Sequence, residues 1–229
     1  MINSHHFKLY KNFLMSKTTN KSIYGKCLLN KKNLKIFFCR KDISFDLVTK
    51  IERNACLNLS LKRKQEFIHS RSYSRIILAD IFRIDPLLVP LNAPLGKQPK
   101  LPKNFGYLSF SHCVDALVVV WSTENVGIDI ERNDRKIDFD LISRKVLTDK
   151  EFSNLSSLDF ADKCLKFIEI WVLKEALIKR NNGRILRDIK NWELNNKKKL
   201  AINYSSHTKV KVKKIEYKNY FIGIASNQI

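Results

Sequence analysis

All five prolines of this chain lie in residues 84–106, which read IDPLLVPLNAPLGKQPKLPKNFG. Proline lacks a backbone N–H and fixes φ, so it neither continues a helix nor sits in a central strand. The stretch therefore predicts a long extended connector, and helices and strands must form on either side of it. Long ordered loops of this kind often carry function.

Hydrophobic periodicity predicts a different content on the two sides of the connector. Before it we expect a strand at 34–40 and a helix at 62–82. After it we expect a strand at 107–113, a hairpin built from 116–131, a helix at 138–144, a helix that begins at the capping box of Thr148, a long helix at 161–180 and antiparallel strands to the end.

Composition limits the classes of protein that need to be considered. Hydrophobic residues make up 44% of the 229 residues, which is enough for a real core in one large domain or two small ones. Charged residues make up 28%, which is near the value for globular proteins and argues against a disordered chain. The formal net charge of +21 predicts a polyanionic partner, such as nucleic acid, a membrane surface, a phosphorylated small molecule or an acidic protein. A codon bias toward Lys and Asn would explain part of the excess equally well.

Cysteine spacing and the lack of long apolar runs bear on the compartment. The five cysteines are scattered and form no CxxC pair, which favours reduced thiols over a disulfide frame or a zinc site. No apolar run approaches the length of a membrane span, and the N-terminal residues have no apolar leader segment. We expect a soluble cytoplasmic protein with no membrane partner.

Two acids stand one residue apart in VGIDIER, residues 126–132. Strand alternation sends Val126, Ile128 and Ile130 to one face, and Gly127, Asp129 and Glu131 to the other. Neighbouring carboxylates on one face repel unless a cation lies between them, and Mg²⁺ takes carboxylate and phosphate oxygens. Gly127 would keep that face open to close approach. An ordinary half-buried strand with exposed acids would give the same pattern.

A helical stripe follows in FIEIWVLKEALIKR, residues 167–180. Trp171, Glu175 and Lys179 are spaced i, i+4 and i+8, with Lys174 beside Glu175. The glutamate is a candidate third metal ligand, and the lysines could neutralise phosphate oxygens. A surface helix with Glu–Lys pairs is the plain alternative.

Two weaker motifs precede these. Ser111 and His112 are adjacent in SFSHC, and adjacent residues of a strand point to opposite faces, so they cannot form a catalytic dyad. His112 could instead contact a phosphate or be a buried histidine. Lys97 lies in the loop GKQP, where a rigid Gly/Pro turn would suit phosphate contact and a plain surface loop is the alternative.

Taken in order, these pieces resemble the surfactin-type 4′-phosphopantetheinyl transferases, over about residues 71–190. That family carries a Gly-Lys-Pro loop, a Ser-His motif, Gly-(Ile/Val)-Asp-(Ile/Val)-Glu and Trp-x-x-Lys-Glu-(Ala/Ser)-x-x-Lys. The matching residues are Gly96-Lys97, Ser111-His112, Gly127 to Glu131 and Trp171 to Lys179. The loop departs from the family by reading GKQP, and Cys113 stands where a serine is usual.

The resemblance implies an α+β fold of two similar subdomains related by a pseudo-two-fold axis, each with a helix packed on a small antiparallel sheet and with coenzyme A in the cleft between them. The expected division is 1–122, contributing to CoA binding, and 123–229, carrying the metal-binding and catalytic motifs. A monomer is expected.

The implied reaction moves the 4′-phosphopantetheine arm of CoA to a serine of an acidic apo acyl-carrier or peptidyl-carrier protein and releases 3′,5′-adenosine bisphosphate. It uses Mg²⁺, or Mn²⁺ in its place, in a setting such as secondary metabolite biosynthesis. The implied metal ligands are Asp129, Glu131 and Glu175. The implied catalytic residues are Glu151, Glu175 and Lys179, with Glu151 and Glu175 as rivals for the base. The implied contacts to CoA are Arg71, Arg75, Lys97, Ser111, His112, Lys174 and Lys179.

Two other classes stay open. A Mg²⁺-dependent nucleic-acid-processing enzyme would use the basic excess and the Asp-x-Glu pair. However, Glu131 is followed by Arg132 and Asn133, so the lysine that restriction-type nucleases place two residues after the glutamate is missing. The other class is a basic binding module without catalysis. The resemblance itself implies no nucleic-acid partner.

Overall fold

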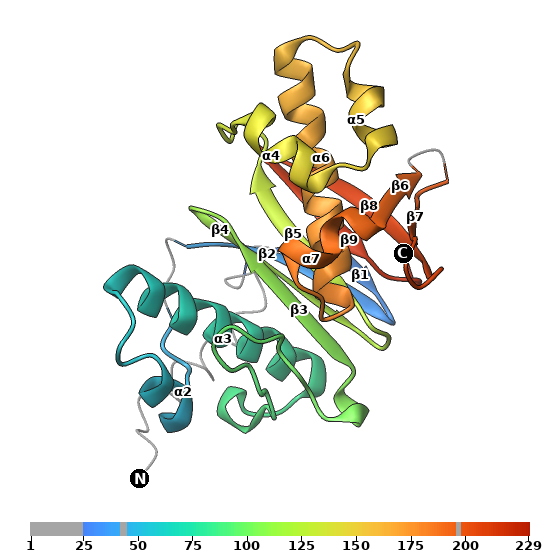
Figure 1. The fold of residues 1–229 in the computed structure, drawn as a ribbon. Coiled ribbons are helices and arrows are strands. Elements are labelled where there is room, and N and C mark those ends of the chain that lie inside the picture. The colour runs from blue at the N-terminus through green and yellow to red at the C-terminus, as the bar shows by residue number, and fades with distance from the viewer. Residues whose placement is uncertain (1–24, 42–44, 196–197) are drawn as a thin grey trace.

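The computed structural model describes residues 25–41, 45–195 and 198–229. The chain forms two antiparallel sheets with helices against them (Figure 1). The first half, up to Ser122, holds a four-stranded sheet in the order β1-β2-β4-β3. Its strands are β1 (Lys26–Lys31), β2 (Leu34–Arg40), β3 (Tyr107–His112) and β4 (Ala116–Ser122).

The second half, from Thr123 on, holds a five-stranded sheet in the order β5-β9-β8-β7-β6. Its strands are β5 (Gly127–Arg132), β6 (Trp192–Asn195), β7 (Leu200–Asn203), β8 (Lys209–Tyr217) and β9 (Tyr220–Ala225). The mixed helix and antiparallel-sheet content confirms the α+β class. The pseudo-two-fold axis and the division into two domains at 122/123 stay predictions.

The helices of the first half are α2 (Lys50–Ala55) and α3 (Leu61–Phe82), and those of the second half are α4 (Phe139–Val146), α5 (Asp149–Leu155), α6 (Phe160–Arg180) and α7 (Ile185–Asp188). The predicted capping box is confirmed: the Thr148 hydroxyl accepts from the Glu151 N–H while the Glu151 carboxylate accepts from the Thr148 N–H. None of the described helices is both long and apolar enough to cross a bilayer.

The two sheets pack face to face around the central core. Apolar side chains of β2 and β4 meet those of β5 and β9 there, with Ile36, Val118, Ile128 and Ile222 fully buried. Helix α3 covers the opposite face of the first sheet, and α6 covers the opposite face of the second (Figure 1). The order of layers is therefore helix, sheet, sheet, helix.

The predicted hairpin over 116–131 is wrong. Strand β4 pairs with β2 and β3, whereas β5 pairs with β9 in the other sheet. The turn between the two apolar runs is thus a crossing between sheets, not a hairpin. Periodicity alone could not separate these outcomes, because both strands are apolar on the face that enters the shared core.

Gly127 allows a close approach, but by a helix rather than by a ligand. A Cβ at Gly127 would lie 1.9 Å from the Ala176 carbonyl oxygen, and one at Gly223 of β9 would lie 2.2 Å from the Val172 carbonyl oxygen. The two glycines therefore let α6 lie directly on β5 and β9. That contact brings the polar end of α6 next to the acids of β5.

Candidate active site between the two sheets

Strands β3 and β5 end their respective sheets and lie against each other. The Ser109 hydroxyl accepts a hydrogen bond from the Ile128 N–H at 3.3 Å, and the Ser111 hydroxyl donates to Asp129 Oδ1 at 2.6 Å. The Ser-His motif and the acidic strand, apart in the sequence, thus form one seam.

Asp129 lies at the centre of the seam and is only 4% exposed. Its Oδ1 also accepts from the Lys179 amino group at 2.6 Å. Its Oδ2 is buried and has no hydrogen-bond partner among the described residues. A buried carboxylate oxygen without a donor is costly, so Asp129 retains an open acceptor toward a cation.

Glu175 and Glu131 complete the acidic group. Glu175 is buried on α6, and its Oε2 lies 3.9 Å from the Lys179 amino group. Burial, reinforced by the charge of Asp129, raises the pKa of Glu175 to about 7. Burial likewise raises the pKa of Glu131 to about 7, although Arg135 pairs with its carboxylate. In both glutamates the effect of burial on the pKa exceeds that of the neighbouring cations Arg135 and Lys179.

Lys179 is the cation that the three acids share. Burial alone would lower the pKa of its amino group, but Asp129 and Glu175 together hold that pKa above its ordinary value. No three His, Cys, Asp or Glu side chains in the described part of the chain converge tightly enough to hold a metal ion as they stand. Asp129, Glu131 and Glu175 nevertheless fit Mg²⁺ by donor chemistry, because they supply hard oxygens, one of them unpartnered.

Ser109 and His112 of β3, with Glu175 and Lys179 of α6, line a cavity of about 800 Å³, called the main cavity below. Ser111, Asp129 and Glu131 are not among its lining residues. Both halves line it: α3, the proline-rich connector and β3 from the first half, and α6 with the turn after it from the second. Its charged walls are mostly basic. They comprise Arg63, Arg71, Lys97, Lys100, Lys179 and Arg184, with His112 and the two acids Glu66 and Glu175.

His112 lines this cavity beside Glu66. The His112 Nε2 lies 3.4 Å from Glu66 Oε2, and the Lys41 amino group lies 3.4 Å from Glu66 Oε1. Burial, with the charge of Lys41, lowers the pKa of His112, and Glu66 opposes this. The lowered pKa favours the neutral form of the His112 ring, which lies among the basic residues of the cavity wall.

Arg71 lines the cavity but already serves the connector. Its Nε and Nη2 donate to the Ala93 carbonyl at 3.1 and 2.7 Å, and its guanidinium stacks 3.7 Å from the centre of the Phe67 ring. Arg71 therefore fixes the segment that leads into Gly96 and Lys97, both of which line the cavity.

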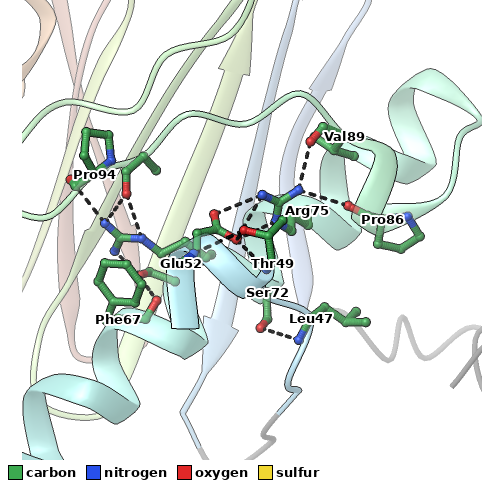
Figure 2. A network of polar contacts seen from close by, with 12 residues as sticks. Leu47, Thr49, Glu52, Phe67, Ser72, Arg75, Pro86, Val89 and Pro94 are labelled. Atoms are coloured by element: carbon green, nitrogen blue, oxygen red, sulfur yellow. Dashed lines mark hydrogen bonds and ion pairs between the residues drawn. The ribbon is translucent and has the colours of Figure 1, made fainter. Parts of the chain in front are cut away.

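Arg75, expected to contact CoA, lies outside the main cavity. It is 2% exposed, pairs with Glu52 at 3.0 Å and donates to the Pro86 and Val89 carbonyls (Figure 2). Glu52 in turn belongs to the capping box of α2 with Thr49. The donors of Arg75 are used inside the protein, so the structure argues against the expected phosphate contact.

Lys174 and Glu151 also lie away from the main cavity. The Lys174 side chain is fully buried, and its amino group lies 2.6 Å from Glu151 Oε2 and 2.8 Å from the Val146 carbonyl oxygen. Glu151 further accepts from the Leu194 N–H at 3.0 Å. The pair ties α6 to α5 and β6, and neither residue lines the main cavity.

Sequence reasoning missed several residues of the cavity wall: Arg63, Glu66, Gln98, Lys100 and Arg184. Arg63, Phe67 and Arg71 are spaced i, i+4 and i+8 on α3, a pattern that could have identified Arg63. Gln98 is the residue by which the GKQP loop departs from Gly-Lys-Pro, whereas Glu66, Lys100 and Arg184 carry no local signal.

Residues 125–225 match the family model described as the 4′-phosphopantetheinyl transferase superfamily. The matched region contains Asp129, Glu131, Glu175 and Lys179. The match supports a relation to this superfamily, whose general activity is phosphopantetheine transfer. No curated protein matches the chain.

Proposed function

We propose that this protein is a surfactin-type phosphopantetheinyl transferase, which moves the 4′-phosphopantetheine group of CoA to a serine hydroxyl of an apo carrier protein. The observation that carries the proposal is the main cavity: cations from both halves line it, and Lys179 in its wall pairs with both Asp129 and Glu175. A cavity of about 800 Å³ suits a nucleotide-sized ligand.

In the proposed reaction the serine oxygen attacks the phosphorus that bears the pantetheine arm. A new P–O bond forms, the bridging P–O bond of the pyrophosphate breaks, and 3′,5′-adenosine bisphosphate leaves with the bond's electron pair. Negative charge grows on the bridging oxygen, so catalysis depends on positioning and on fixed positive charge.

Asp129, Glu131 and Glu175 would hold Mg²⁺, or Mn²⁺ in its place. When bound, the ion would neutralise pyrophosphate oxygens and polarise phosphorus toward attack. The Lys179 amino group, 2.6 Å from Asp129 and in the cavity wall, would donate to pyrophosphate oxygens.

The other cavity cations suit the remaining phosphate. Lys97 and His112 lie on the walls contributed by the first half, and Arg63, Lys100 and Arg184 add charge. Ser111 acts through Asp129, which it holds by a hydrogen bond of 2.6 Å. We leave Arg75 and Lys174 out of the proposed contacts and assign Arg71 to positioning of the connector.

Two glutamates compete for the serine proton. Glu175 lines the cavity, within reach of a substrate held there. Glu151 is held by Lys174 outside the cavity. We therefore favour Glu175, with Glu151 as a positioning residue that fixes the helix carrying Glu175.

The net charge of +21 supports an acidic carrier as the partner, because opposite charge accelerates encounter. The test is mass spectrometry of an apo carrier protein incubated with the enzyme, CoA and Mg²⁺. The expected result is a gain of one phosphopantetheine on the carrier serine, abolished by EDTA. Absence of the gain from acyl-carrier and peptidyl-carrier proteins, or cleavage of DNA instead, would contradict the proposal.

A further inference from the structure

The glutamine in GKQP, the residue that separates this loop from the Gly-Lys-Pro form, joins the two halves of the molecule. The Gln98 side-chain amide donates to the backbone carbonyl of Lys179 at 2.5 Å. Lys179 is the residue whose amino group pairs with Asp129. One hydrogen bond therefore links the loop that presents Lys97 to the helix end that presents Lys179.

The C-terminal end of α6 offers an acceptor to this donor. The last four carbonyls of an α-helix have no partner within the helix. In α6 the Leu177 carbonyl accepts from Asn181, that of Ile178 from the Gly183 N–H, and that of Arg180 from the Asn125 amide at 2.8 Å. The Lys179 carbonyl accepts from Gln98 and, at 3.3 Å, from the Asn182 N–H. All four are satisfied, and Gln98 supplies the donor that comes from the first half.

The loop is otherwise secured within the first half. Asn92 and Lys100 exchange backbone hydrogen bonds of 2.7 and 3.0 Å, and Arg71 holds the Ala93 carbonyl. The tip between these anchors carries Gly96 and Lys97, and Gln98 fastens it across to α6. Without Gln98, the tip would keep its base but lose this link to the second half.

Gln98 also stands in the wall between two cavities. A second cavity of about 500 Å³ lies beside the main one. Gln98, Pro99, Lys100 and Asn182 line both cavities. Loss of the Gln98 hydrogen bond would loosen this partition and let the main cavity widen on that side.

We propose that Gln98 is a positioning residue that sets the spacing of Lys97 and Lys179, cations from opposite halves, across one polyphosphate substrate. The inference rests on the proposed function. It assigns to Gln98 the binding geometry of CoA, not the chemistry of transfer, so its loss should weaken binding and leave turnover of bound substrate nearly unchanged.

The test compares Gln98→Met, which keeps length but lacks the donor, with Asn125→Leu as the matched control. Asn125 donates to the neighbouring Arg180 carbonyl at the same helix end but does not line the main cavity. A purely structural capping role predicts the same behaviour for both variants. A positioning role predicts that only Gln98→Met raises the KM for CoA, by about tenfold with kcat within about twofold of the unaltered enzyme.

Limited trypsin cleavage of the ligand-free proteins tests the loop without any transfer assay. We expect faster cleavage after Lys97 and Lys100 in Gln98→Met than in the unaltered protein or in Asn125→Leu. Equal cleavage rates, or an unchanged KM, would overturn the role of Gln98. If the unaltered enzyme modifies no carrier and binds no CoA by calorimetry, the proposed function fails and the substrate role of Gln98 fails with it. The cleavage result would then still report whether Gln98 holds the loop.

Discussion

The amino group of Lys179 lies 2.6 Å from Asp129 Oδ1 and joins α6 to β5 at the seam between the two sheets. The same amino group lies 3.9 Å from Glu175 Oε2. In this structure the acids thus use a protein cation, which occupies the position where a divalent ion would compete for them. The relationship gives the first prediction.

Replacing Lys179 by methionine should raise the affinity of the CoA-free protein for Mg²⁺ by about tenfold, because a competing ammonium is removed from the carboxylates. The same change should abolish transfer, because Lys179 would no longer donate to the pyrophosphate. Titration calorimetry with Mg²⁺ measures the first effect. Weaker or unchanged Mg²⁺ binding would show that Lys179 and the ion do not share a site.

The buried pair of Lys174 and Glu151 predicts a stability effect. Glu151→Gln keeps the shape of the side chain and one acceptor oxygen but leaves the Lys174 ammonium buried without a counter-charge. We expect a loss of about 3–5 kcal/mol in the free energy of unfolding, measured by urea denaturation.

The double variant Glu151→Gln with Lys174→Met is its control, because it removes the unpaired ammonium and keeps the same side chain at position 151. Without an uncompensated buried charge, the double variant should unfold closer to the unaltered protein than the single variant does. If the single and double variants unfold at the same urea concentration, the pair does not stabilise the fold in the way described.

Gly127 sets how closely α6 approaches β5. Gly127→Ala would place a methyl group 1.9 Å from the Ala176 carbonyl oxygen, so helix and strand must separate. We expect a loss of about 3 kcal/mol in the free energy of unfolding. Gly183→Ala serves as a comparison, since its Cβ would meet only the Asp188 side chain. In thermal unfolding, the Tm of the Gly127→Ala variant should be well below that of Gly183→Ala, and the reverse order would contradict the close packing of α6 on β5.

His112 predicts a pH dependence of stability. Its pKa is lowered in the folded protein by burial and by Lys41, with Lys179 acting in the same sense and Glu66 opposing. The unfolded chain then binds more protons, so stability falls as pH drops through the unfolded value of about 6.5 toward the folded pKa. In His112→Gln this part of the loss should disappear. Urea midpoints of both proteins between pH 8 and pH 5 measure the difference, and parallel curves would contradict the assignment.

Local patterns predicted the elements that local forces determine. Strand β2 and helix α3 fall where alternation and helical spacing placed them, and the capping box at Thr148 begins α5. The stripe of Glu175 and Lys179 on α6 meets the acidic strand because Gly127 permits close packing. The pattern showed which residues share a face, and packing then determined which faces meet.

Partners distant in the sequence could not be predicted in this way. Arg75 forms an ion pair with Glu52, and Lys174 forms one with Glu151, each 23 residues away in the chain. Nothing in the local spacing of either cation distinguishes a buried ion pair from a phosphate contact. The crossing from β4 to β5 was missed for the same reason, since sheet membership depends on tertiary pairing.

We propose that Asp129, Glu131 and Glu175 act with Lys179 as one metal-dependent transfer site. The decisive measurement is the rate of phosphopantetheine transfer to an apo carrier by Asp129→Asn at several Mg²⁺ concentrations, with thermal unfolding of the same samples. We expect a rate lower by at least about 100-fold in a folded protein. Near-normal, Mg²⁺-dependent transfer by folded Asp129→Asn would contradict it.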